Sequence, residues 1–281
     1  MAKKTKEAEY IRSKTNALML NYRVYYMTAK ERLTTILIGF AIGALVGYVF
    51  YGNQFLDADG APTSATGICN LVILLVAGAI GASVFVPMRT EQLRAKRQTE
   101  LTKQFRSWLD SLAVALSTGM NTHDALASSK EDLIVEYGPK SHIVNEVTDM
   151  ISSIHNNIPL VQTLNFFSER SQIEDIANFS TVFAVSSEAG GNIKDVVRRT
   201  STIISDKLAV NEQIETTITS NKSQFTVMMF IPVVIIMMMR SISSDFARSF
   251  SSITGVLVNT VALGIFYIAF RIGNKIMDIK R

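Results

Sequence analysis

Side chains that commonly carry chemistry are few in this sequence and widely separated. His123, His142 and His155 lack the spacing of metal ligands, and Cys69 stands alone, so neither a metal cluster nor a disulfide framework is indicated. The adjacent carboxylates Glu174 and Asp175 stand where a helix is expected to begin, and acidic residues at such a position are usually solvated. We therefore expect no catalytic residue, no bound metal and no cofactor.

A glycine pair at residues 190 and 191 precedes a predicted helix, where backbone N–H groups could bind a phosphate. The stretch lacks the GxxxxGK[ST] pattern and follows no predicted strand, so we interpret it as a junction between helices. No GxSxG motif and no pairing of Cys with His indicates a nucleophile. The apolar segments also lack the aspartates of an intramembrane protease and the charges of an ion-coupled carrier. The sequence therefore favours a protein that is not an enzyme.

Four long apolar segments without any Asp, Glu, Lys or Arg dominate the hydropathy pattern. They are residues 33–51, 68–88, 225–239 and 253–270, in a chain with 48% hydrophobic residues and a mean hydropathy of +0.23. A helix needs about 20 apolar residues to cross a bilayer, so the third segment must recruit its neighbours. We predict a polytopic membrane protein with four transmembrane helices, arranged as hairpins at 33–88 and 225–281.

The distribution of Lys and Arg orients these helices. Residues 1–32 contain eight basic residues, whereas residues 52–67 contain none and carry two aspartates. Because basic residues favour the cytoplasmic side, we predict that both termini and residues 89–224 are cytoplasmic. Residues 89–106 hold six basic and two acidic residues, while residues 107–224 hold eight basic and fifteen acidic ones. This layout suits contact with membrane lipid rather than with nucleic acid.

Glycines line one face of the first apolar segment. Gly39, Gly43 and Gly47 recur at every fourth residue, and the second segment carries Gly78 and Gly81. Small residues at this spacing allow helix backbones to approach closely in a membrane. We predict that these glycines pack against a neighbouring helix, which is either the second apolar segment or a helix of another subunit.

Residues 89–224 show helical periodicity throughout. Apolar stripes recur at helical spacing and are separated by Gly119, by Gly138 with Pro139, and by the glycine pair at 190 and 191. No alternating apolar pattern of useful length predicts a strand. We expect an all-α fold, in which this segment forms a cytoplasmic antiparallel bundle of about six helices between the second and third spans.

The last helix of the predicted bundle is the longest. No glycine or proline occurs between Gly191 and Pro232, and apolar residues keep helical spacing until the polar face disappears after Lys222. We interpret this stretch as one helix that continues from the bundle into the bilayer. The alternative is two helices with a break near Ser223.

Residues 1–32 combine their basic residues with interspersed aliphatic and aromatic ones. This pattern is typical of a basic amphipathic helix that lies on anionic lipid headgroups. A disordered basic tail is the alternative for residues 1–14.

Three stretches of the segment 89–224 are similar to motifs of a known family. They read SWLDSLAVALSTGMNTHDAL at residues 107–126, IPLVQTLNFFSER at residues 158–170 and FAVSSEAGGNIKDVV at residues 183–197. In order and spacing they resemble the F-domain family of type II secretion and type IV filament systems. With two spans before and two after, the chain is most similar to the platform proteins of tight adherence (Tad) pili. The resemblance marks these family-motif residues: Gly119, Ala125, Leu126, Glu188, Gly190, Gly191 and Asn192.

The resemblance implies a platform in the bacterial inner membrane that has no catalytic activity of its own. Such a platform couples a hexameric cytoplasmic secretion ATPase to the extraction of pilin subunits from the bilayer and to filament assembly. It also implies association with further copies of the chain or with a paralogous platform subunit. A small membrane carrier or enzyme, and a membrane-anchored helical receptor, are the alternatives that the composition leaves open.

Overall fold

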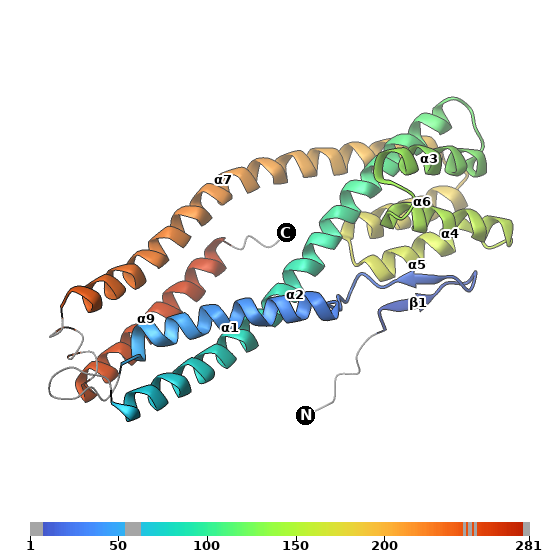
Figure 1. Cartoon of the computed structure of the whole chain (residues 1–281). Coiled ribbons are helices and arrows are strands. Elements are labelled where there is room, and N and C mark those ends of the chain that lie inside the picture. The colour runs from blue at the N-terminus through green and yellow to red at the C-terminus, as the bar shows by residue number, and fades with distance from the viewer. Residues whose placement is uncertain (1–7, 54–62, 244–245, 247–248, 250–251, 278–281) are drawn as a thin grey trace. The chain divides into compact units, whose positions relative to one another are not determined.

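The computed structural model describes residues 8–53, 63–243, 246, 249 and 252–277, which form two compact units (Figure 1). The polar unit consists of residues 8–26 and 90–212, and the apolar unit consists of the remaining described residues. Two helices, α2 (Ser64–Ser117) and α7 (Ile193–Ile242), contribute residues to both units. The two units are therefore connected by continuous helical backbone.

Among the described residues, the apolar unit contains four helices that are long and apolar enough to cross a membrane. They are α1 (Ala29–Tyr51), the first part of α2, the last part of α7 and α9 (Ile253–Met277). The four predicted segments are thus confirmed as apolar helices of sufficient length. The third gains the length that it lacked because its apolar stretch begins at Ser223 and ends at Arg240.

The helices α2 and α7 are both longer than a membrane span. The sequence predicts that the second span ends at residue 88, whereas α2 continues to Ser117 with Pro87 inside it. Proline removes a single backbone donor, and neighbouring groups in membrane proteins often compensate for that loss. The helix α7 also continues through Pro232, so the prediction of one continuous helix is confirmed.

The glycine faces of α1 and α2 pack against each other. A Cβ atom on Gly43 would lie 3.0 Å from the Cα atom of Gly81, and one on Gly81 would lie 2.8 Å from the Cα atom of Gly43. The other glycines of the two faces make similarly close contacts: Gly39 with Ala82, Gly47 with Ala77, and Gly78 with Phe40. Such approaches are possible because glycine has no side chain. The neighbour of the glycine face of α1 is therefore α2 of the same chain.

Replacing Gly43 with leucine is expected to force α1 and α2 apart, because the new side chain would enter space that Ala77 and Gly81 fill. Overpacking of this kind costs about 1–3 kcal/mol. The Tm of the detergent-purified chain should fall. Gly264→Leu in α9 is the matched control, since nothing lies within 4 Å of the Cβ position of Gly264. Equal losses of Tm in the two variants would contradict the close packing of α1 on α2.

Side chains of α7 and α9 bind the end of α1. The last carbonyl groups of a helix have no partner within it. Arg240 of α7 donates hydrogen bonds to the carbonyl oxygens of Val49 and Gly52, the latter at 2.5 Å. In α9, Nδ2 of Asn259 donates to the carbonyl oxygen of Phe50 at 3.3 Å. These bonds connect both C-terminal helices of the apolar unit to α1.

The polar unit combines the second part of α2 and the first part of α7 with four shorter helices. These are α3 (Thr122–Tyr137), α4 (His142–His155), α5 (Leu160–Ser171) and α6 (Glu174–Glu188). They share one apolar core. Neighbouring rings among four of its aromatic side chains have centroids 5.5 to 6.2 Å apart: Phe105, Trp108, Phe167 and Phe179. Burying each of these side chains stabilises the unit by about 1.5–3 kcal/mol.

The N-terminal segment contradicts the sequence prediction. Its described part is a hairpin rather than a helix: β1 (Tyr10–Arg12) pairs antiparallel with β2 (Leu18–Leu20), and Ile11 lies opposite Met19. Each strand has only three residues, which is too short for an alternating pattern to be recognised. Met19 and Tyr22 are buried against the polar unit instead of facing lipid. The prediction of a helix on lipid headgroups is therefore wrong for residues 8–26. Elsewhere in the described chain the expectation of an all-helical fold is confirmed.

Candidate functional site

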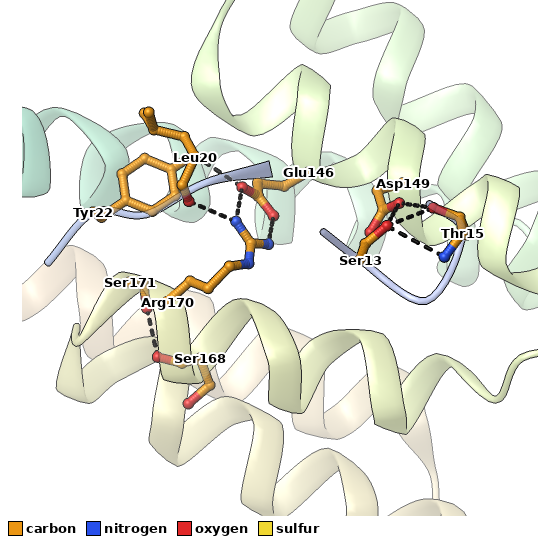
Figure 2. Close-up of polar contacts among 9 residues, drawn as sticks. All are labelled: Ser13, Thr15, Leu20, Tyr22, Glu146, Asp149, Ser168, Arg170 and Ser171. Atoms are coloured by element: carbon orange, nitrogen blue, oxygen red, sulfur yellow. Dashed lines mark hydrogen bonds and ion pairs between the residues drawn. The ribbon is translucent and has the colours of Figure 1, made fainter. Parts of the chain in front are cut away.

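A network of polar contacts ties the N-terminal segment to α4 and α5 (Figure 2). We call residues 8–26 the N-terminal clasp. The clasp consists of the β1–β2 hairpin and the residues that flank it. Its partners lie more than 120 residues later in the chain, so the network closes a long loop of sequence.

A buried ion pair between Glu146 of α4 and Arg170 of α5 forms the centre of this network. Nη1 of Arg170 donates to Oε1 of Glu146 at 3.0 Å and Nη2 donates to Oε2 at 2.5 Å, while each side chain is only 2% exposed. Nη1 also donates to the carbonyl oxygen of Leu20 at 2.8 Å. The hydroxyl of Tyr22 donates to Oε1 of Glu146 at 3.0 Å. The ion pair thus binds both the backbone and a side chain of the clasp.

Burial determines the electrostatics of this pair. It raises the pKa of Glu146 above its usual value, and the guanidinium of Arg170 opposes that shift. Burial likewise raises the pKa of Tyr22 well above its usual value, with a further contribution from the nearby Glu146. Removing two charges from water costs several kcal/mol per ion, and only good geometry with additional hydrogen bonds offsets this cost. Leu20 and Tyr22 of the clasp supply those additional bonds.

Asp149 of α4 holds the turn of the hairpin. Its Oδ1 atom accepts hydrogen bonds from Oγ of Ser13 at 2.9 Å and from Oγ1 of Thr15 at 2.5 Å. Because residues three apart lie on the same face of a helix, Glu146 and Asp149 both present their carboxylates to the clasp. The clasp is therefore held at its turn and at its second strand, as Figure 2 shows.

Two basic residues of the clasp form exposed hydrogen bonds with α5. Nε of Arg23 donates to the carbonyl oxygen of Glu169 at 2.9 Å, and Nζ of Lys14 donates to Oε1 of Gln162 at 2.5 Å. The sequence pattern assigned the basic residues of this segment to lipid headgroups. At Lys14 and Arg23 the partner is instead α5 of the same chain.

A hollow of about 490 Å³ lies between the clasp and α4. Its walls include Tyr10 and Leu18 of the clasp together with Lys140 and His142. His142 packs edge-on against Tyr22, with ring centroids 5.5 Å apart, and burial lowers its pKa. Among the described residues, no three potential metal ligands come together here or elsewhere. The contacts around the hollow hold the clasp against α4 and α5.

The family-motif residues lie outside the clasp network. Ala125 and Leu126 of α3 are fully buried in the core of the polar unit. Gly119 follows α2 with φ 88°, and Gly190 follows α6 with φ 66°. Both backbones adopt left-handed conformations that favour glycine, so these residues end their helices.

The remaining motif residues form the junction between α6 and α7. Glu188 is the last residue of α6. The backbone N–H of Gly191 donates to the carbonyl oxygen of Ser186 at 2.7 Å, which is the longer hydrogen bond of a Schellman motif. Nδ2 of Asn192 donates to Oδ2 of Asp195 at 2.8 Å in the first turn of α7. The glycine pair is thus a helix junction, as the sequence indicated.

The helices α2 and α7 are joined by side-chain hydrogen bonds. Nε of Arg106 in α2 donates to Oγ of Ser205 in α7 at 2.7 Å. The hydroxyl of Ser201 in α7 donates to Oδ1 of Asp110 in α2. These bonds pair the last turns of α2 with the first turns of α7, the two helices that continue into the apolar unit.

Sequence analysis did not single out Glu146, Arg170 or Tyr22. One available signal was the position of Glu146, three residues after the buried Ile143 and therefore on the apolar stripe of α4. A second was that Arg170 is the only Lys or Arg among residues 141–193. A charge on a buried stripe needs a partner of opposite charge. No comparable signal identified Tyr22.

Residues 108–239 match the model of the family described as type II secretion system (T2SS), protein F. The match begins in α2, covers α3 to α6 and ends in the candidate span of α7. It includes Glu146 and Arg170 but not the clasp, and it extends over slightly less than half of the chain. No curated protein and no solved structure matches the chain.

The match confirms the resemblance at the level of a T2SS protein F domain. Members of that family are membrane platform proteins of secretion and pilus machinery. Four apolar helices of membrane-spanning length accompany this domain, which fits a multi-pass protein of the inner membrane. The narrower likeness to tight adherence pili stays a prediction.

Proposed function

We propose that the chain is a non-enzymatic platform protein in the bacterial inner membrane. It serves a tight adherence pilus, another type IV filament or a type II secretion-like machine. In this role it couples a hexameric cytoplasmic ATPase to the extraction of pilin subunits and their addition to a filament. Its further partners are other copies of the chain or a paralogous platform subunit. The match of residues 108–239 to protein F carries this proposal.

The connections between the two units support a mechanical role. Both α2 and α7 pass from the polar unit into a candidate span without a break in the helix. A helix has a fixed rise and bonded backbone groups, whereas a flexible linker would absorb motion. A third connection comes from the clasp, because only Met27 and Thr28 separate Tyr26 from the first residue of α1. Three connections suit the transfer of force between a motor and pilins in the bilayer.

The proposed orientation places the polar unit and both termini in the cytoplasm. The basic residues among residues 89–106 then lie beside the anionic inner leaflet. The acidic excess of residues 107–224 lies beyond them, on the side where an ATPase is available.

Deletion of the gene in its filament-forming host is expected to abolish surface filaments while leaving the amounts of pilin and ATPase unchanged. Filaments are counted by electron microscopy, and the two proteins are measured by immunoblotting. A plasmid copy of the wild-type chain should restore assembly, and the purified ATPase should be retained by the tagged full-length chain. Normal filament numbers in the deletion strain would refute the platform role, and turnover of a transported solute would favour a carrier.

A further inference from the structure

Two histidines that are far apart in the sequence meet at one end of the α3–α4 pair. His123 lies in the first turn of α3, and His155 is the last residue of α4. Their Nε2 atoms are 3.3 Å apart, and the planes of the two rings cross at 85°. The side chain of His123 is 37% exposed and His155 is exposed, so ions in solution have access to both.

The second ring nitrogen of His123 faces a carboxylate. Nδ1 of His123 lies 3.3 Å from Oδ1 of Asp124, and a neutral imidazole makes this contact by donating its Nδ1–H. Asp124 is held by Asn121, whose Nδ2 donates to Oδ2 of Asp124 at 2.8 Å. In this tautomer the lone pair of His123 Nε2 accepts a hydrogen bond from Nε2–H of His155. When a metal ion binds, it takes the place of that proton, and His155 carries its proton on Nδ1 instead. A carboxylate bonded to the outer nitrogen of a histidine is the usual arrangement behind zinc ligands.

The separation of the two Nε2 atoms equals that of two ligands of one zinc ion. With Zn–N distances of about 2.0–2.1 Å and tetrahedral angles, two ligand nitrogens lie about 3.3 Å apart. We propose that His123 and His155 bind one Zn²⁺ through their Nε2 atoms, with Asp124 orienting His123. No third protein ligand is present in the described part of the chain, so water completes the coordination.

The chemistry of the ligands selects the type of metal. Imidazole nitrogens suit Zn²⁺ and similar transition metals, whereas Ca²⁺ and Mg²⁺ prefer oxygen ligands. Bound zinc connects the start of α3 to the end of α4, opposite the turn at Gly138 that joins these helices. Because the ion binds the folded protein, it stabilises the polar unit by mass action.

The full-length chain, purified in detergent and stripped of metals with EDTA, provides the test. Titration with ZnCl₂ is expected to raise its Tm, whereas CaCl₂ and MgCl₂ are expected to leave it unchanged. His123→Gln and His155→Gln should each weaken zinc binding, measured by calorimetry, at least about tenfold, and Asp124→Asn by about 10–100-fold. Co²⁺ in place of Zn²⁺ should give the intense visible absorption of a tetrahedral site in the wild-type chain.

A variant that keeps the wild-type Tm in the absence of metal has lost a zinc ligand and not its fold. The cobalt spectrum tests the site in the wild-type chain and requires no variant. His142 is unchanged in these variants, so any zinc that they still bind shows how much binding occurs at other histidines. Zinc stabilisation of the same size in the His123→Gln, His155→Gln double variant would overturn the proposal. The absence of any effect of zinc on the wild-type chain would overturn it as well.

Discussion

Replacing Arg170 with leucine is expected to destabilise the polar unit by about 3–5 kcal/mol, because the buried carboxylate of Glu146 then lacks its counter-ion. The same change removes the hydrogen bond from Arg170 to the carbonyl oxygen of Leu20, so the clasp should detach from α4 and α5. The Tm of the full-length chain should fall. Limited proteolysis followed by mass spectrometry should show faster cleavage within residues 8–26.

Two further variants make the result specific to the ion pair. Arg23→Leu also removes a guanidinium that bonds the clasp to α5, but this bond is exposed, so the expected loss is about 1 kcal/mol or less. Replacing both Arg170 and Glu146 with leucine should recover much of the stability, since no buried charge is left unpaired. An Arg170→Leu variant as stable as Arg23→Leu would mean that the pair does not hold the clasp.

The pH dependence of the Arg170→Leu variant identifies the unpaired carboxylate. Burial already raises the pKa of Glu146, and the loss of Arg170 raises it further because the guanidinium opposes that shift. When a carboxyl group has a higher pKa in the folded state than in the unfolded state, the free energy of unfolding decreases as the pH rises through the folded-state pKa. The stability difference from wild type should therefore be smaller at about pH 5 than at about pH 8. His142, whose pKa is lowered by burial, is present in both proteins and cancels in this difference.

A proline in place of Ser223 is expected to abolish filament assembly if the chain is the proposed platform. Ser223 is the first residue of the candidate span in α7, where the helix leaves its polar part. Proline in a helix interior removes a backbone hydrogen bond, bends the helix and costs about 3 kcal/mol. The variant should still insert into the membrane and retain the ATPase, because the core of the polar unit lies before residue 212.

Ser223→Ala is the matched control, since alanine keeps the helix and removes only the hydroxyl. Filaments are counted by electron microscopy, while membrane levels and ATPase co-purification are measured in the same strains. Filament loss with normal membrane levels and normal ATPase retention would separate a coupling defect from a folding defect. Normal filament numbers in the Ser223→Pro strain would mean that α7 does not transmit the motion.

The sequence was sufficient to predict the apolar helices of membrane-spanning length, the glycine faces and the continuity of α7. These features depend on local properties: hydropathy over about 20 residues reports a span, and apolar residues at helical spacing report one face of a helix. Gly43 could be assigned to a packing surface because glycines at every fourth residue allow another helix to approach closely, whichever helix that is. Which helix it contacts was left open, since the pattern records only that close approach is possible.

The partners of the polar side chains could be identified only from the folded structure. The clasp folds onto α4 and α5 because Tyr22 and Arg170 meet at Glu146, residues that no local pattern connects. In the same way, His123 and His155 are brought together by the turn between α3 and α4. The free energy of a buried charge depends on which group lies beside it, and that neighbour is set by the packing of distant segments rather than by adjacent sequence.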